Sequence, residues 1–224
     1  MTQAYQLSLF EQTINYQKAQ TTLPKNFRLT HNIGKGGIKT KAAKNIEAIK
    51  LSKKLDQENR YPTLTEQGIL AEYLGWGIAP EIFEEPLKPS WEHLGNQLKA
   101  LLTPTEYQAA RKSIINAYYT TPEIIQEIYQ GLKHLGFSGS RILEPSMGCG
   151  LFLGLAPTPL NHRGKWTGIE LDSITGRIAQ QLYPEADIYI KGFENVMLPP
   201  NYFDLAIGNV PFSNITPNDP KYNK

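Results

Sequence analysis

The segment RILEPSMGCGLF at 141–152 constrains the fold of this chain more than any other stretch. It runs from a short apolar strand into a tight turn with two glycines. Glycine lets the backbone turn sharply and come close to a ligand that a β-carbon would push away. In α/β proteins such a turn follows a parallel strand, at the edge where nucleotide-like ligands bind. The segment therefore predicts an α/β fold with a ligand-binding turn at 146–150.

The alternation of apolar strands and helical stretches between residues 140 and 212 supports the same fold class. Strands are predicted at 141–145, 166–171, 187–191 and 203–208, with a helix from Asp172 to Leu182 after the second strand. The strands are almost continuously apolar, which is typical of a parallel sheet covered on both faces. We expect an α/β domain with the glycine turn after its first strand.

Composition divides the chain into three regions. Residues 1–38 are polar and irregular, and we expect a flexible basic lead-in. Residues 39–116 form a predicted helical unit, in which Thr63–Glu66 and Thr103–Glu106 have the pattern of helix capping boxes. Residues 117–224 carry the strands and the glycine turn. A further helix is predicted to begin at 121–122, with an apolar stripe of Ile124, Ile125, Ile128 and Leu132.

Positive charge is concentrated near the N terminus. Residues 1–60 hold eleven Lys/Arg and four Asp/Glu, although the net charge of the whole chain is only +2. A basic arm beside an acidic body is consistent with contact to the phosphates of DNA. A solvated helix face explains the same charges. The sequence leaves both interpretations open.

Several classes of protein are excluded by composition. The single cysteine, Cys149, cannot form an internal disulfide, and the four histidines have no metal-ligand spacing. No apolar run approaches the ~20 residues of a membrane helix. The N terminus lacks the charged and apolar regions of a signal peptide. We therefore expect a cytoplasmic protein with no metal site and no membrane partner.

Two acidic residues narrow the ligand of the glycine turn. Glu170 ends the second predicted strand, about 20 residues after the turn, where such folds hold a ribose. A dinucleotide-binding enzyme is the main alternative. Such enzymes usually have the pattern G-x-G-x-x-G, but here the third glycine, Gly154, falls one place late. Glu144 would repel a pyrophosphate and attract an ammonium group. S-adenosyl-L-methionine carries that ammonium and no phosphate, so Glu144 favours it as the cofactor.

The segment GNVPF at 208–212 follows the fourth predicted strand. An exocyclic amino group of a base is a poor nucleophile, because its lone pair is delocalised into the ring. The side-chain carbonyl of Asn209 and the backbone carbonyl of Val210 could accept its two hydrogens and localise the lone pair. Phe212 could stack on a base that has left its duplex. The segment predicts methyl transfer to an amino group.

In this order, the motifs resemble those of amino-group DNA methyltransferases of the adenine (N6) type. The resemblance covers about 117–212 and implies a partial class I, Rossmann-like sheet. It also implies two sets of functional residues. The catalytic set is Asn209, Val210, Pro211 and Phe212, and the set that binds S-adenosyl-L-methionine is Tyr119, Thr121, Pro122, Glu144, Pro145, Ser146, Gly148, Gly150, Glu170 and Phe193.

This sequence departs from the family pattern at three places. Val210 replaces the first proline of the catalytic motif but keeps the backbone carbonyl. Gly192 stands where the family offers an aspartate to the adenine of the cofactor, which leaves Phe193 to pack on that ring. The chain ends at Lys224, before the last strands and the target-recognition region of the family. We therefore expect a fragment that is inactive alone, with a fused or separate C-terminal polypeptide completing the domain.

The N-terminal unit shows a narrower resemblance. Segments such as TEQGILAEYLGWG at 65–77 and AYYTTP at 117–122 are similar to large plasmid- and phage-borne proteins that join an adenine methylase to a helicase. The resemblance implies DNA as a partner. Two other functions stay open: a non-catalytic fragment that binds cofactor or nucleic acid, and a methyltransferase for a protein side-chain amide.

Overall fold

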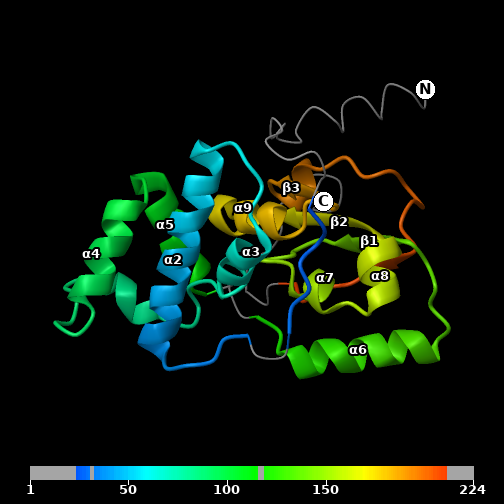
Figure 1. The fold of residues 1–224 in the computed structure, drawn as a ribbon, viewed down its shortest axis with the longest axis horizontal. Helices are drawn as coiled ribbons and strands as arrows, with labels where there is room; N and C mark the ends of the chain where they lie inside the picture. The colour runs from blue at the N-terminus through cyan, green and yellow to red at the C-terminus, as the bar shows by residue number, and fades with distance from the viewer. Residues whose placement is uncertain (1–23, 31–32, 116–118, 211–224) are drawn as a thin grey trace, which may run out of the picture.

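The computed structural model describes residues 24–30, 33–115 and 119–210. A group of helices occupies one side of the molecule and a sheet the other, with α3 and α9 between them (Figure 1). The helical group comprises α2 (Ile38–Gln57), α3 (Leu64–Leu70), η1 (Pro80–Phe83), α4 (Glu92–Leu101) and α5 (Pro104–Ser113). The remaining elements are α6 (Pro122–His134), β1 (Arg141–Glu144), α7 (Leu151–Leu155), α8 (Thr158–Arg163), β2 (Lys165–Glu170), α9 (Ser173–Leu182), β3 (Asp187–Ile190), η2 (Phe193–Asn195) and β4 (Leu205–Ala206).

Local sequence explains the helical unit well. Both predicted capping boxes are present: the side chains of Thr63 and Thr103 accept from the backbone N–H of Glu66 and Glu106, which reach back in turn. Such boxes satisfy backbone donors that a helix start leaves free. Four apolar residues near helical spacing in α2, Ala42, Ile46, Ile49 and Leu55, are buried.

The four strands of the sheet are parallel and follow the order β3-β2-β1-β4. Register pairs Ile142 of β1 with Trp166 of β2 on one side and with Leu205 of β4 on the other. The chain steps outward from β1 to β3 and then returns to the opposite side of β1. The α/β fold class is confirmed, with a parallel sheet behind a helical unit. The return point beside β1 is where such sheets bind ligands.

Strand β4 is shorter than the predicted 203–208 and is fastened to β1 at its start. Asp204 Oδ2 accepts from the backbone N–H groups of Ser140 and Arg141, at 3.1 and 2.9 Å. The Arg141 guanidinium lies 2.8 Å from Asp204 Oδ1 and, with these hydrogen bonds, holds the pKa of that carboxyl well below its usual range. The carboxylate therefore sets where β4 meets β1.

Helix α9 joins the sheet to the helical unit. Its N-cap is Asp172, whose side chain accepts from the backbone N–H of Thr175 at 2.8 Å. The helix contacts β2 and β3 of the sheet, and it also packs on α2 and α3 of the helical unit. Gln181 Nε2 donates to the backbone carbonyl of Ser52 in α2 at 3.1 Å. One cluster of buried apolar side chains runs through both groups of elements. The helical unit and the sheet thus share a core.

The segment before α2 is anchored to the same helix. Within residues 24–30, Phe27 N donates to Leu182 O at 2.9 Å, and Leu29 N donates to Gly154 O at 3.0 Å. Leu29 is buried and Lys25 pairs with Glu185 at 2.7 Å. These contacts fix the described part of the expected lead-in against α7 and the end of α9.

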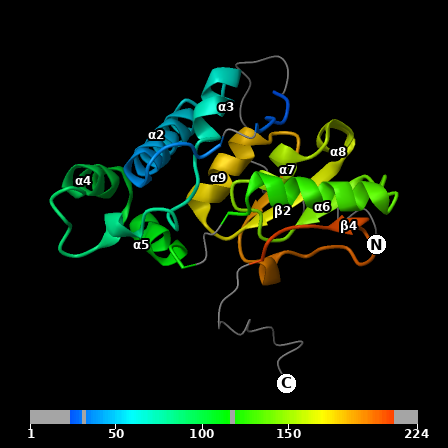
Figure 2. The same cartoon turned by 90° about the horizontal axis from the view of Figure 1, so that it is seen from below.

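Helix α6 lies on the sheet side of the molecule (Figure 2). It begins where predicted, with Thr121 at the N-cap position and Pro122 at the first helical position. Its buried side chains are Ile125 and Tyr129, whereas Ile124 is 54% exposed. The predicted stripe of Ile124, Ile125, Ile128 and Leu132 was thus wrong in part. The Tyr129 hydroxyl donates to the carbonyl of Phe152 in α7 at 2.6 Å, which turns that side of the helix inward.

Candidate functional site

The turn between β1 and α7 has the conformation that its glycines predict. Gly148 and Gly150 have φ values of +55° and +78°, a region that side chains with a β-carbon rarely adopt. A β-carbon on Gly148 would lie 2.9 Å from a ring carbon of Tyr119, and one on Gly150 would collide with the ring of Tyr183. Both positions therefore require glycine for conformation and for space.

Glu170 is bonded to this turn. Its Oε2 accepts from the backbone N–H of Gly148 at 2.8 Å, and its Oε1 accepts from the N–H of Asp172 at 2.7 Å. Burial raises the pKa of Glu170, and these two hydrogen bonds oppose that effect. The half-buried carboxylate at the end of β2 is thereby fixed beside the glycine turn.

Glu144 is the most buried acid of the site, with 1% of its surface exposed. The backbone N–H groups of Phe152 and Leu153 hydrogen-bond its carboxyl group. Its Oε2 is buried and has no hydrogen-bond partner. Burial, and next the charge of Glu170, raise the pKa of Glu144 well above its usual range. A buried acceptor without a partner is costly, so this oxygen suits a cationic or donor group of a ligand.

The end of β4 meets the end of β1 at the same place. Ile207 N donates to Leu143 O at 2.9 Å, so the backbone after β4 stays paired with β1 for one more residue. A β-carbon on Gly208 would lie 3.6 Å from Glu144 Cγ and 3.7 Å from Pro145 Cδ. Asn209 follows directly and is half-buried. The first residue of the predicted catalytic segment thus lies next to the predicted cofactor motif.

The other predicted residues differ in burial, and two of them lie outside the described residues. Tyr119 is half-buried against the glycine turn, and its pKa is raised, first of all by burial. Thr121 is exposed and makes no capping hydrogen bond with its side chain. Phe193 is 50% exposed in η2, just beyond β3. Val210 is also exposed, whereas Pro211 and Phe212 lie outside the described residues. Pro122, Pro145 and Ser146 are half-buried.

Two tyrosines at the site were missed by sequence reasoning. Tyr183 is buried and fills the space beside Gly150 and Gly154, with its hydroxyl unpaired. Nothing in the local sequence at the end of α9 marks it. Tyr73 comes from the helical unit, and its backbone carbonyl accepts from Cys149 Sγ at 3.5 Å. In the sequence, Tyr73 was marked only by belonging to the segment at 65–77, which carries the N-terminal resemblance.

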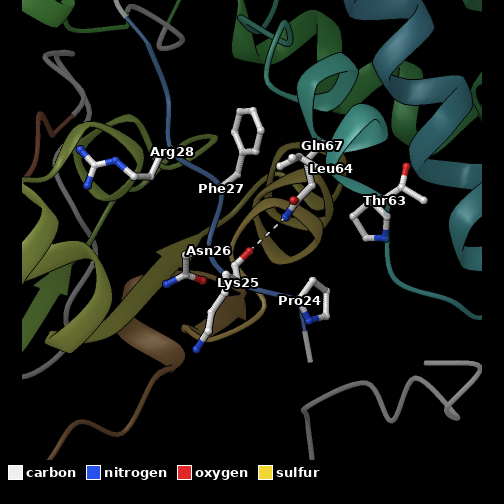
Figure 3. A pocket seen from close by; sticks show the side chains of 9 residues that line it. Pro24, Lys25, Asn26, Phe27, Arg28, Thr63, Leu64 and Gln67 are labelled. Carbon is white, nitrogen blue, oxygen red and sulfur yellow. Dashed lines mark hydrogen bonds between the residues drawn. The ribbon is translucent and has the colours of Figure 1, made fainter. Parts of the chain in front are cut away.

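A pocket of about 530 Å³ lies elsewhere, between the segment at 24–28 and the start of α3 (Figure 3). Lys25, Arg28 and Gln67 are among its lining residues, and no predicted site residue lines it. Arg28 donates to Thr158 Oγ1 and Gln67 to backbone carbonyls, so these polar groups already have partners. The size of this pocket therefore says nothing about the chemistry at the end of β1.

Half of the ten Lys and Arg side chains in the described part of residues 24–60 form ion pairs within the protein. Ion pairs with carboxylates involve Lys25, Lys44, Lys53, Lys54 and Arg60. For these five residues, the ion pairs give the charge a structural role on the protein surface. In the described ranges, no group of three or more His, Cys, Asp or Glu side chains could hold a metal ion. No helix described there has the length and apolar character of a membrane span.

Comparisons with known proteins give partial similarities. No family model matches the chain. "Defense against restriction protein B" of Escherichia phage P1 is 36% identical over 100 residues, which is 44% of this chain and 4% of that protein. The chain therefore matches only a small part of that relative's length.

Two solved structures resemble this chain over most of its length. A type I restriction-modification system methyltransferase subunit from Streptococcus thermophilus has a TM-score of 0.36 and 14% identity, covering 75% of this chain and 44% of that one. A Listeria monocytogenes protein described as a class I S-adenosylmethionine-dependent methyltransferase has a TM-score of 0.37 and 12% identity, covering 77% and 59%. Neither likeness is close enough to carry a function to this chain.

Proposed function

We propose that this chain forms the cofactor-binding part and the catalytic motif of a DNA adenine (N6) methyltransferase that uses S-adenosyl-L-methionine. The observation that carries the proposal is the convergence at the ends of β1, β2 and β4. The side chain of Glu144, whose buried Oε2 has no partner, lies with its Cγ beside Gly208, one residue before Asn209. Glu170 is bonded to the glycine turn on the other side of β1.

The chain's own groups fit the proposed cofactor. The unpartnered oxygen of Glu144 would hold the ammonium of its amino-acid end through the ionised form of the carboxyl group, and this form would repel a phosphate. Glu170 would accept from the ribose hydroxyls with the lone-pair capacity that its backbone hydrogen bonds leave free. Phe193, exposed beyond β3, would pack on the adenine ring. When bound, S-adenosyl-L-methionine supplies the methyl group of its sulfonium.

Asn209 would orient the target amino group. Its side-chain carbonyl accepts one hydrogen of that group, and the backbone carbonyl of Val210 accepts the other. Both hydrogen bonds localise the nitrogen lone pair without a strong base, which suits a nucleophile as weak as an aromatic amine. The change from proline to Val210 leaves this carbonyl in place. Phe212 would stack on the extruded base, as proposed from the sequence.

DNA is favoured as the substrate over a protein amide for one reason. The phage relative is named for defence against restriction, and restriction acts on DNA. A protein side-chain amide remains the alternative substrate that the same motif could serve. The proposal includes a further polypeptide, fused or separate, that supplies the rest of the methyltransferase sheet, and a role beside a helicase.

Binding and transfer experiments test the proposal. Titration calorimetry should detect S-adenosylhomocysteine binding to the purified chain, with no binding of NAD, whose pyrophosphate would meet Glu144. When the chain is supplied with the polypeptide that completes the sheet, a transfer assay with tritiated S-adenosylmethionine should label DNA containing adenine rather than a mixture of proteins. Binding of NAD in place of S-adenosylhomocysteine would overturn the cofactor assignment. Label on protein alone would overturn the assignment of DNA as the substrate.

A further inference from the structure

We propose that Tyr73 is a positioning residue of the cofactor site, through which the N-terminal helical unit holds the glycine turn and the start of α9. The inference rests on the function proposed above. It gives a role to the segment at 65–77, which the methyltransferase chemistry leaves unexplained. Tyr73 is 1% exposed and contacts the site through both its side chain and its backbone.

The side chain of Tyr73 reaches the N-terminal turn of α9. Its hydroxyl lies 3.3 Å from Thr175 Oγ1, and Thr175 Oγ1 donates to Asp172 Oδ1 at 2.6 Å. Since the Thr175 proton is directed to the carboxylate, the hydroxyl of Tyr73 must be the donor in the first of these contacts. Tyr73 thus orients Thr175, and Thr175 orients the N-cap of α9.

The same network continues into the cofactor site. The backbone N–H of Asp172 donates to one oxygen of Glu170 at 2.7 Å, and the N–H of Gly148 donates to the other at 2.8 Å. Cys149 follows Gly148 and donates through Sγ to the backbone carbonyl of Tyr73 at 3.5 Å. The contacts therefore form a closed circuit that begins and ends at Tyr73 and includes the predicted ribose-binding acid.

The surrounding segment fixes Tyr73 from the side of the helical unit. Asn45 of α2 accepts from the backbone N–H of Leu74 at 2.8 Å and donates to the carbonyl of Gly75. Gly75 has a φ value of +68°, which allows the chain to reverse after α3. Tyr73 is held just before this reversal. Its position is therefore set by a buried amide in another helix.

The start of the segment is fastened independently. Gln67 Nε2 donates to the backbone carbonyl of Leu182 at the end of α9, at 3.2 Å. Arg60 makes two hydrogen bonds of 2.6 and 2.7 Å to Glu66, which also closes the capping box of α3. Segment 65–77 therefore holds α9 near both of its ends, and Tyr73 provides the contact at the cofactor end.

Loss of the Tyr73 hydroxyl should weaken the cofactor site without unfolding the protein. The aromatic ring keeps its packing in a Tyr73→Phe variant, and only the donor to Thr175 is removed. We expect S-adenosylhomocysteine affinity to fall about 3- to 10-fold, the effect of one hydrogen bond. 5′-Methylthioadenosine should lose affinity by a similar factor, because it keeps the ribose that Glu170 would bind.

The experiment compares four variants of the chain by calorimetry and by hydrogen exchange of the segments at 146–150 and 170–175. Thr175→Val removes the middle of the circuit, whereas Thr175→Ser keeps the hydroxyl and should bind like wild type. Tyr107→Phe is the matched control, because it removes a tyrosine hydroxyl from the same helical unit outside the circuit. Tyr73→Phe and Thr175→Val should each speed exchange at both segments, and their effects on affinity should not add.

Unchanged affinity and exchange in both Tyr73→Phe and Thr175→Val would overturn the inference. Loss of affinity in Tyr107→Phe to the same degree would also overturn it, since the effect would then be a general loss of stability. If the wild-type chain binds no S-adenosylhomocysteine, the proposed function falls and exchange alone decides the role of Tyr73. Thr175→Val keeps the test decisive if Tyr73→Phe fails to fold.

Discussion

The backbone N–H of Gly148 donates to Glu170 Oε2 over 2.8 Å, so the glycine turn after β1 and the end of β2 form one hydrogen-bonded unit. The predicted ribose-binding acid therefore also helps to shape the turn that is predicted to approach the cofactor. The two roles are compatible, because a carboxylate oxygen can accept more than one hydrogen bond.

Substitution of Glu170 should weaken cofactor binding. We expect Glu170→Ala to reduce the binding free energy of S-adenosylhomocysteine by ~1–3 kcal/mol, the usual loss for a hydrogen bond to a charged group. Glu170→Gln should also lose affinity, because its NH₂ group would face the backbone N–H of Gly148 or Asp172. Calorimetry measures both, with Glu127→Gln on the exposed side of α6 as the control. Equal affinity in wild type and Glu170→Ala would remove Glu170 from the site.

The buried carboxyl of Glu144 should make stability depend on pH. Burial raises its pKa in the folded state above that of an unfolded glutamate, about 4.3. Its protonated form therefore stabilises the fold fully below that unfolded pKa, and this contribution is lost as pH rises through the raised pKa. Glu144→Gln has no charge to bury, so its melting temperature should fall less over the same range. Melting temperatures of wild type and Glu144→Gln, measured from about pH 4 upward, test this expectation. Equal changes of melting temperature with pH in the two proteins would contradict it.

The same carboxyl should make cofactor affinity depend on pH in the opposite direction. An ammonium group binds the ionised form of Glu144, so S-adenosylhomocysteine should bind more tightly as pH rises through the raised pKa. 5′-Methylthioadenosine lacks the amino-acid end and should show a weaker dependence. Calorimetric titrations of the two ligands at matched pH values make the comparison. Identical pH profiles for both ligands would place the ammonium away from Glu144.

Asn209 should be needed for transfer and not for cofactor binding. In any preparation of the chain that transfers methyl groups, Asn209→Ala should lower turnover at least ~100-fold, the scale of losing one preorganised electrostatic contact. S-adenosylhomocysteine affinity should change little, since Asn209 would face the target base. Single-turnover assays measure the first effect and calorimetry the second. Near-normal turnover would remove Asn209 from the catalytic residues.

Local chemistry explains which parts of the structure were predictable. The helix starts at Pro104, Pro122 and Ser173 were found because capping residues and proline determine them within a few residues. The turn at 146–150 was found because its glycines leave few alternatives. The parallel sheet followed from apolar strands that alternate with helices.

The errors and omissions come from contacts between distant residues. The side of α6 that faces the core depends on the hydrogen bond from Tyr129 to the carbonyl of Phe152. Residue spacing alone allows either of two adjacent faces of this helix to be the buried one. Tyr73 and Thr175 lie 102 positions apart, so no local pattern could join them. Strand β4 was predicted too long, because strand length depends on pairing with β1 as well as on composition.

Gly154 should not tolerate a side chain. A β-carbon there would collide with the Tyr183 hydroxyl and lie 2.5 Å from Leu29 Cδ1. Gly154→Ala should therefore destabilise the chain by ~1–3 kcal/mol, the cost of overpacking a core. Tyr183→Phe removes an unpaired buried hydroxyl and should be neutral or stabilising by itself. Denaturant unfolding of the single and double variants should show partial rescue of Gly154→Ala by Tyr183→Phe. Additive effects would mean that the two residues do not meet.

The free side of β4 should govern the association state. In the part of the chain that the structure describes, β4 pairs with β1 on one side and with no strand on the other. Leu205 and Ala206 provide none of the usual protections of an edge strand, such as lysine or proline. We expect this edge either to pair with a second copy of the chain or to accept a strand from another polypeptide. Both outcomes follow from unpaired backbone groups of β4.

A lysine at the edge tests this expectation. Ala206 is exposed, so Ala206→Lys can place a charge beside the free backbone groups without entering the core. Light scattering over a concentration series should show less association for Ala206→Lys than for wild type. Met197→Lys adds the same charge at an exposed apolar residue outside the strands, and should leave association unchanged. A wild-type chain that stays monomeric at all concentrations and methylates DNA unaided would show that β4 is not an edge in solution.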